Sequence, residues 1–372
     1  MHDTAHVSII KHFEDIHDTR VDRSKKYKLT DILFLSLTAI LCGADTFVEI
    51  ENFGNASLPF FSKYIDTESG IPSHDTIGRV FSSINPQEFQ NSFLQWILDI
   101  VKSTKGKVVA IDGKAIRGVK NPIHMVNVWV AENSVLFGQA KVDSKQNEIV
   151  AINKLLKILD LEGTIVTIDA MGCQKDIVEK ICAQNADYVI ALKANQKNLL
   201  ENTKIFFDSE DLTNEAVFDI SETVEKSRDR FERRVCITTQ ADEILEYVNR
   251  KSQWRNLTTL IKLGSTRKIK GKTSYQERYF ISSLNENAEI IASIVRKHWS
   301  VENNLHWVLD ISFREDETLA RVKHAAENLS LLKKIVLSLI KQDKAKGSMK
   351  SKRNRAGWNI EFRERLLGLI SG

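Results

Sequence analysis

Lys107-Val-Val-Ala-Ile-Asp-Gly-Lys114 is the stretch that decides the fold class of this chain. Its four consecutive apolar residues include β-branched ones, which predicts a buried strand that ends at Asp112. Thr164-Ile-Val-Thr-Ile-Asp-Ala170 repeats the pattern and ends in a second aspartate, Asp169. Because ligands gather at the carboxyl ends of parallel strands, both aspartates are expected at one edge of a shared sheet.

The segments around these two strands predict the order of strands and helices along the chain. Further strands are predicted over 124–130, 134–142 and 188–192, and helices over 148–159, 174–184 and from about 195. Three strands on short links, followed by parallel strands with helical crossovers, are typical of a mixed sheet of the ribonuclease H type. The fold class expected is therefore α/β, with a ribonuclease H-like mixed sheet, a β-rich insertion and an all-helical N-terminal domain.

The rest of the chain divides around this core. Residues 1–105 are predicted to be a helical, DNA-binding domain, although helices of this kind, including the one that carries Arg79, equally suit plain packing. Short apolar-rich runs such as 243–248 predict strands in the insertion. The catalytic core would comprise 106–211 and 285–340, the β-rich insertion 212–284, and a basic C-terminal tail 341–372.

A long amphipathic helix is predicted over Ile294 to Asp310, where apolar residues recur at helical spacing without Gly or Pro. Glu302 and His306 lie four residues apart on it and share a face. Such a helix could simply fill the core while Glu302 faces water. If Glu302 instead meets the two aspartates, three carboxylates converge. Such hard oxygen ligands suit a pair of Mg²⁺ or Mn²⁺ ions and hence in-line phosphoryl transfer.

Each aspartate also has a purely structural interpretation. Asp112 stands before a glycine, as turn-forming aspartates often do, and Asp169 could cap the helix that follows it. Either explanation is adequate for one residue alone. Three carboxylates at the right places in one order of strands and helices favour a shared site instead.

The composition narrows the class of protein. Fifty-three Lys and Arg against 49 Asp and Glu give a net charge of +4, so a nucleic-acid partner would have to be met by local basic patches. The four cysteines form no C-x-x-C pair, which argues against a zinc ribbon or a disulfide framework. The longest uncharged run, residues 32–44, is too short to span a bilayer, and the first residues lack the pattern of a secretion signal. We therefore expect a cytoplasmic protein without a membrane anchor.

Four longer motifs surround the acidic residues: Ile111-Asp-Gly-Lys-Ala-Ile-Arg-Gly118, Thr167-Ile-Asp-Ala-Met-Gly-Cys-Gln174, Asp187-Tyr-Val-Ile-Ala-Leu-Lys-Ala-Asn-Gln196 and His298-Trp-Ser-Val-Glu-Asn-Asn-Leu-His-Trp-Val-Leu-Asp310. Together they closely resemble the insertion-sequence transposases of the DDE type, and most nearly the bacterial H-repeat-associated proteins. The helical segment 29–88 resembles the same group, so the resemblance covers nearly the whole chain.

This resemblance implies a DNA transposase in which Asp112, Asp169 and Glu302 are the catalytic and metal-binding residues. Such enzymes use an activated water to cut DNA at the ends of the element, and the freed 3′-hydroxyl then attacks target DNA. The implied cofactor is Mg²⁺, with Mn²⁺ able to substitute. The implied partners are double-stranded element ends and target DNA, bound by a homodimer or higher oligomer in the nucleoid of a bacterium.

Contacts with DNA phosphates are expected from basic runs and from cationic or histidine side chains near the acidic residues. Residues 251–275 contain no acidic residue, and a second basic run lies at 341–355. The candidate DNA-binding residues are Arg79, Lys114, Lys193, Lys268, Lys270, Arg296, His298 and His306. Two other functions stay open, a nuclease that cuts without joining and a catalytically inactive, host-retained DNA-binding protein.

Overall fold

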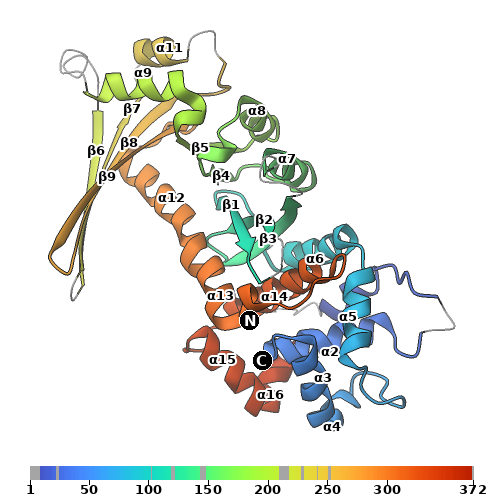
Figure 1. The fold of residues 1–372 in the computed structure, drawn as a ribbon. Coiled ribbons are helices and arrows are strands. Elements are labelled where there is room, and N and C mark those ends of the chain that lie inside the picture. The colour runs from blue at the N-terminus through green and yellow to red at the C-terminus, as the bar shows by residue number, and fades with distance from the viewer. Residues whose placement is uncertain are drawn as a thin grey trace.

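The computed structural model describes residues 9–21, 25–101, 103–118, 122–142, 148–208, 218–227, 230–240, 242–249 and 253–370 (Figure 1). Within these residues the strands form one mixed sheet of nine, in the order β3-β2-β1-β4-β5-β9-β8-β7-β6. Helices pack beside the sheet and form a separate cluster at the end where both termini lie, as Figure 1 shows. The prediction of a mixed α/β fold with a helical N-terminal region is confirmed.

Five strands make up the central part of the sheet. β1 (Val108–Ile116) is antiparallel to β2 (Ile123–Val130), which is antiparallel to β3 (Val135–Val142). On its other side β1 is parallel to β4 (Ile165–Ile168), and β4 is parallel to β5 (Asp187–Leu192). The apolar run that begins β1 is fully covered, since its first four residues are at most 1% exposed. The predicted succession of three strands, then helix, strand, helix and strand along the chain is therefore confirmed.

The predicted β-rich insertion extends this same sheet. β6 (Phe218–Ser227), β7 (Arg230–Thr239), β8 (Thr259–Ile269) and β9 (Lys272–Ser282) are antiparallel, and β9 pairs with β5 from Val189↔Ser282 to Leu192↔Tyr279. The long strands rise from the core as one arm (Figure 1). Because the backbone hydrogen bonds continue across β5 and β9, the arm is tied directly to the central strands.

One segment of the insertion differs from the prediction. The run 243–248, expected as a strand, belongs to a helix, α11 (Asp242–Val248). Leu245 and Val248 are its more covered apolar residues and stand three apart, which suits one face of a helix and not the alternation of a strand. Residues 212–217, 228–229, 241 and 250–252 of the predicted insertion lie outside the described residues.

Helices join the strands and carry the chain back across the sheet. α7 (Glu148–Ile158), α8 (Lys175–Ala183) and α9 (Lys197–Asp208) follow β3, β4 and β5 in turn. α12 (Ala288–Val301) packs against β1, β4 and β5 and against β6 and β7 of the arm. It continues through a π-helical turn, Glu302–His306, into α13 (Trp307–Phe313). The predicted helix 294–310 is thus helical throughout. However, the Trp307 N–H bonds to the carbonyl of Glu302, five residues back.

The N-terminal residues form six helices within the described part: α1 (Ile9–Phe13), α2 (Leu29–Leu41), α3 (Phe47–Ala56), α4 (Leu58–Phe61), α5 (His74–Ser83) and α6 (Pro86–Val101). Ser73 caps α5, because its hydroxyl accepts a hydrogen bond from the Thr76 N–H. α14 (Ala325–Gln342) is buried along most of its length and packs against α5, α2, α6 and β3. The helical region and the sheet therefore share one apolar core.

The end of the chain is folded where a basic tail was expected. Residues 349–366 form α15 (Met349–Trp358) and α16 (Ile360–Leu366). Arg353 is only 4% exposed, donates to the carbonyl oxygen of Ile40 (2.7 Å) and pairs with Asp45 (2.6 Å). This basic residue thus satisfies carbonyl oxygens at the end of α2, which explains its burial. Among the described residues, no helix has the length and apolar composition needed to cross a membrane.

Candidate active site

Parallel pairing places the two predicted aspartates at one edge of the sheet. β1 and β4 are in register up to Ile111↔Ile168, where their pairing ends. Asp169 directly follows β4, as predicted, whereas Asp112 lies inside β1 and not at its end, because β1 continues to Ile116 through its pairing with β2. Both aspartates line a small cavity of about 80 Å³. The structural interpretation of Asp169 also holds, since its Oδ1 accepts a hydrogen bond from the Met171 N–H (3.1 Å) at the start of a short 3₁₀ turn. Asp169 can therefore cap this turn and still lie at the sheet edge that it shares with Asp112.

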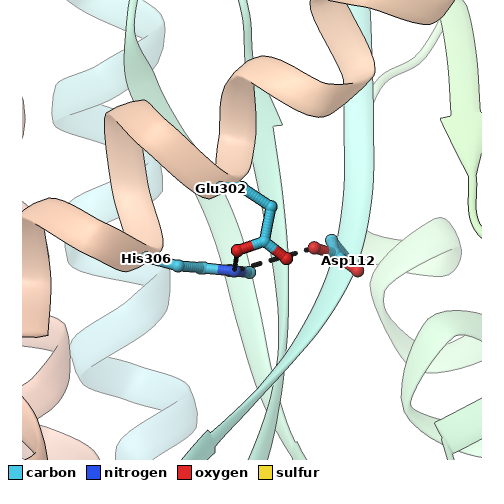
Figure 2. Close-up of side chains that lie close together, drawn as sticks. All are labelled: Asp112, Glu302 and His306. Carbon is cyan, nitrogen blue, oxygen red and sulfur yellow. Dashed lines mark ion pairs between the residues drawn. The ribbon is translucent and has the colours of Figure 1, made fainter. Parts of the chain in front are cut away.

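The π-helical turn brings Glu302 to this edge. Glu302, His306 and Asp112 each offer a ligand atom, and these three atoms all lie within 4.8 Å of one another. His306 Nδ1 is 3.5 Å from Glu302 Oε2 and 3.6 Å from Asp112 Oδ2. Figure 2 shows Glu302 reaching from the helix toward Asp112 on its strand. Glu302 thus points toward the first aspartate, although its side chain is still 54% exposed.

The electrostatics of the site reflect crowded negative charge. Burial raises the pKa of Asp112 to about 6; His306 opposes this shift, while Glu302 and Asp169 add to it. His306 lowers the pKa of Glu302, which keeps that carboxylate ionised. Asp112 lies in both groupings, because it shares a cavity with Asp169 and a cluster of ligand atoms with Glu302, whereas Asp169 does not belong to that cluster. Their catalytic roles stay a prediction.

The donor set fits a hard divalent cation. Carboxylate oxygens are the ligands that Mg²⁺ and Mn²⁺ prefer, and the two aspartates and Glu302 supply them at one edge. His306 is 5% exposed, and its Nε2 has no hydrogen-bond partner among the described residues. Its Nδ1 faces the carboxylates, so the imidazole is placed to hold Glu302 beside Asp112.

We expect metal binding to weaken as the pH falls through about 6. The ionised carboxylate is the ligand, and the raised pKa of Asp112 means that protons compete with the metal below that pH. With one displaced proton, the apparent Mn²⁺ affinity should fall about tenfold per pH unit well below the pKa. Calorimetric titration between pH 5 and 8 would measure this dependence. An affinity that stays constant from pH 5 to pH 7 would contradict it.

Lys114 lies two residues after Asp112, yet it faces inward. It is 9% exposed, and its Nζ lies 2.7 Å from Asp310 Oδ1 and 3.1 Å from Glu315 Oε2. Burial opposes its charge, but Glu315 and Asp310 still raise its pKa. The ammonium expected to contact DNA therefore joins β1 to α13 and to the turn that follows. Sequence reasoning missed both carboxylates, which lie 196 and 201 residues further along the chain.

His298 is also internal. It is 6% exposed, its Nδ1 is 3.0 Å from the Thr167 hydroxyl, and burial lowers its pKa to about 4. A neutral imidazole held against β4 is a packing element of α12 and is not presented to DNA phosphates.

The other candidate DNA-binding residues lie on the surface but not in one place. Lys193 is exposed just after β5, and Lys268 and Lys270 are exposed at the tip of the β8–β9 hairpin. Arg79 is exposed on α5, where its Nε donates to the carbonyl of Asp75 (3.3 Å). Arg296 is exposed on α12 and pairs with Glu225.

A basic groove of about 770 Å³ lies between the arm and α12. Six cationic side chains and two carboxylates line it: Lys226, Arg230, Arg234, Arg267, Arg296 and Lys297, with Glu225 and Glu232. Glu232 is buried and is paired with Arg230, Arg234 and Arg267, so the arginines are held in place and still exceed it in charge. Sequence reasoning named Arg296 and included Arg267 in the basic run 251–275, but it did not find the arginines of β7, which share that strand with Glu232 and apolar residues.

Trp299 and Asn303 place this groove beside the acidic site. Trp299 is 40% exposed in the wall of the groove, and the Arg278 guanidinium lies 4.2 Å above its ring. Asn303 also lines the groove and is the residue after Glu302. The groove and the acidic site therefore share the same stretch of helix, although none of the clustered residues Asp112, Glu302 and His306 lines the groove.

The comparisons with known proteins agree with this geometry. Residues 103–339 match the profile of the family described as "Transposase DDE domain", and residues 10–97 match one described as "DDE_Tnp_1-associated". The chain therefore belongs to the family of transposases that share the DDE domain.

Individual relatives indicate the group of transposases, within this family, that the chain resembles. The "H repeat-associated putative transposase YhhI" of Escherichia coli K12 is 37% identical over 366 residues, which span 95% of this chain and 96% of that protein. The "Putative transposase YncI" of Escherichia coli O157:H7 is 39% identical over 374 residues, 98% of this chain and 95% of the relative. The resemblance to the H-repeat-associated group is thus confirmed.

One solved structure shows a distant likeness. A chain of the piggyBac transposase synaptic complex with hairpin DNA superposes with a TM-score of 0.44 at 9% identity. The superposition covers 96% of this chain and 80% of the other.

Proposed function

We propose that this protein is a DNA transposase that cuts the ends of an insertion sequence and joins them to target DNA. The observation that carries the proposal is the meeting of Glu302 with Asp112 at the sheet edge where Asp169 also lies. Membership of the DDE transposase family supports the same reaction class. Mg²⁺ is the proposed cofactor, with Mn²⁺ able to replace it.

The proposed catalytic core is ribonuclease H-like. The order β3-β2-β1-β4-β5, antiparallel over the first three strands and parallel over the rest, supports this assignment. We assign residues 106–211 and 285–340 to the core, 212–284 to the insertion and 1–105 to a helical domain that contributes to DNA binding. The arm formed by the insertion then lies beside the site, because β9 pairs with β5.

In the proposed mechanism, Asp112, Asp169 and Glu302 would hold two divalent ions, which when bound would supply Lewis-acid activation and charge stabilisation for an in-line displacement. His306 keeps Glu302 oriented, and Lys114 holds β1 against α13, so that the carboxylates stay in one place. The same site serves cutting and joining, because the attacking oxygen belongs to water in the first step and to the DNA 3′-hydroxyl in the second.

We propose that the basic groove binds the phosphate backbone of DNA and leads it to the carboxylates. Its excess of cationic side chains suits phosphates, and Asn303 places its end next to Glu302. Lys193, Lys268, Lys270 and Arg79 are proposed as further, separate contacts. Two element ends held together would need a homodimer or higher oligomer, acting at the nucleoid in the bacterial cytoplasm.

Removing one cation from each wall of the groove should weaken DNA binding and its dependence on salt. For the Lys226→Ala/Arg296→Ala double variant, the slope of log affinity against log salt should fall by about 0.9 for each phosphate that the protein no longer neutralises. Fluorescence anisotropy with a labelled duplex at several salt concentrations measures the slope. Lys157→Ala, an exposed lysine on α7, is the control. Equal slopes for the double variant and the control would contradict a role of the groove.

The proposed function is tested with purified protein, Mg²⁺, a supercoiled target plasmid and labelled duplexes that carry the terminal repeats flanking the gene. Labelled ends joined to the plasmid are the expected result. Nicked ends without joining would instead indicate the nuclease alternative. A mobility shift without any cutting, with or without Mg²⁺, would favour the inactive DNA-binding protein.

A further inference from the structure

Glu148 is a carboxylate beside the aspartates that none of the roles above includes. It is the first residue of α7 and lines the same small cavity as Asp112 and Asp169. Neither Glu302 nor His306 lines this cavity. Conversely, the three ligand atoms that cluster within 4.8 Å belong to Asp112, Glu302 and His306 and exclude Glu148. Asp112 is therefore the residue common to two neighbouring groups of donors.

Gly113 allows Glu148 to come this close to β1, at the position next to Asp112. A Cβ atom at position 113 would lie 2.4 Å from Glu148 Oε1 and 3.3 Å from its carboxyl carbon. Any side chain there would push the carboxylate away from the strand. The absence of a side chain next to Asp112 thus has a specific structural effect, which is to admit a second acidic group.

The carboxylate of Glu148 has no partner in the described part of the chain. No hydrogen bond or ion pair satisfies it there, and it is partly buried beside the cavity that it shares with Asp112 and Asp169. A partly desolvated carboxylate that faces another one is unfavourable unless something compensates both charges. A divalent cation between them would do so.

We propose that Glu148 is a fourth carboxylate of the metal site and holds one divalent ion together with Asp169. Asp112 would be shared between this ion and the one held by Glu302. The inference rests on the proposed function, and it assigns to α7 a ligand that the pattern of two aspartates and one glutamate does not contain.

Mn²⁺ binding to Glu148→Gln tests the proposal directly. The wild-type chain should bind two Mn²⁺ ions, counted by electron paramagnetic resonance of free Mn²⁺ and by calorimetry at neutral pH. Glu148→Gln should bind only one, or bind the second at least about tenfold more weakly, as expected when one ligand of a site is lost. Glu162→Gln, an exposed glutamate beyond the end of α7, should keep both ions. Two ions bound to Glu148→Gln with wild-type affinity would overturn the proposal.

A thermal unfolding series separates a ligand from a merely structural residue. Without metal, Glu148→Gln should unfold at the wild-type temperature or above it, because the substitution removes repulsion with Asp169. With saturating Mn²⁺ the rise in unfolding temperature should be smaller than that of wild type. A variant that is less stable without metal but gains as much from Mn²⁺ as wild type would contradict the proposal.

Gly113→Ala provides a second variant in which Glu148 itself is kept. Its methyl group should displace the Glu148 carboxylate and remove the second ion, and retention of both ions would count against the proposal. The cleavage assay on wild type is read separately. One outcome is that wild type binds two ions and Glu148→Gln binds one, while wild type never cuts DNA. That outcome would support Glu148 as a ligand and refute the proposed transposase function. Normal cleavage and two ions in Glu148→Gln would refute the ligand alone.

Discussion

Asp112→Asn and Glu302→Gln are each expected to lower DNA cleavage by at least about 10²–10³-fold, the size of losing one preorganised group at a charged transition state. Both substitutions keep the shape of the side chain but remove the negative charge that binds the metal. Asp169→Asn should behave in the same way. DNA affinity should stay close to wild type, because cationic side chains, and not these carboxylates, are expected to bind the DNA phosphates.

Cleavage of a labelled element end is measured as a single-turnover rate, and affinity by anisotropy with Ca²⁺ in place of Mg²⁺. Asp176→Asn is a matched control, since Asp176 is an exposed aspartate that pairs with Lys180 across one turn of α8. Wild-type cleavage by any of the three site variants would remove that residue from the catalytic set. Parallel loss of cleavage and affinity would instead point to a damaged fold.

Glu315→Ala should destabilise the protein by about 3–5 kcal/mol, the usual cost of removing one partner from a buried ionic network. Glu315 is 1% exposed, accepts a hydrogen bond from the Ser330 hydroxyl (2.7 Å) and lies 3.1 Å from Lys114 Nζ. Burial lowers the pKa of Lys334 to about 8, and Glu315 opposes that shift. Without Glu315, two interior ammonium groups would lose their main counter-charge.

Denaturation in urea at neutral pH would report this loss as a lower midpoint. Glu317→Ala is the control, because Glu317 belongs to the same short turn but faces solvent. A midpoint for Glu315→Ala equal to that of the control would show that the network does not stabilise the fold. Because Lys114 sits on β1 next to the site, Glu315→Ala should also loosen Asp112 and reduce cleavage.

Hydrophobic patterning was sufficient to predict the central strands and the edge where Asp112 and Asp169 meet. Buried strands need continuous apolar runs, and parallel register then fixes which residues follow at the edge. The helix that carries Glu302 was equally evident from its periodicity. Its π turn was not, because a single extra residue in one turn leaves the apolar spacing almost unchanged.

Contacts between distant parts of the chain were what the sequence could not reveal. Glu148 gave no signal, since an acidic residue in the first turn of a helix is ordinary stabilisation of the helix dipole. Lys114 and Arg353 resembled DNA-binding residues because their charge is visible in the sequence, whereas the carboxylates and carbonyl oxygens that enclose them are 196 and 313 residues away. Burial of a cation depends on partners that composition does not disclose.

The π turn at Glu302–His306 has a consequence for how easily the acidic site could be lost. A π turn accommodates one extra residue while the helices on either side keep their orientation, so deleting one residue from it would restore ordinary α-helix with α12 and α13 still in place. Only the side chains within the turn, those of Glu302 and His306 among them, would change their relative positions. Loss of a single codon within this turn would therefore disrupt the acidic site while the fold around it stayed intact.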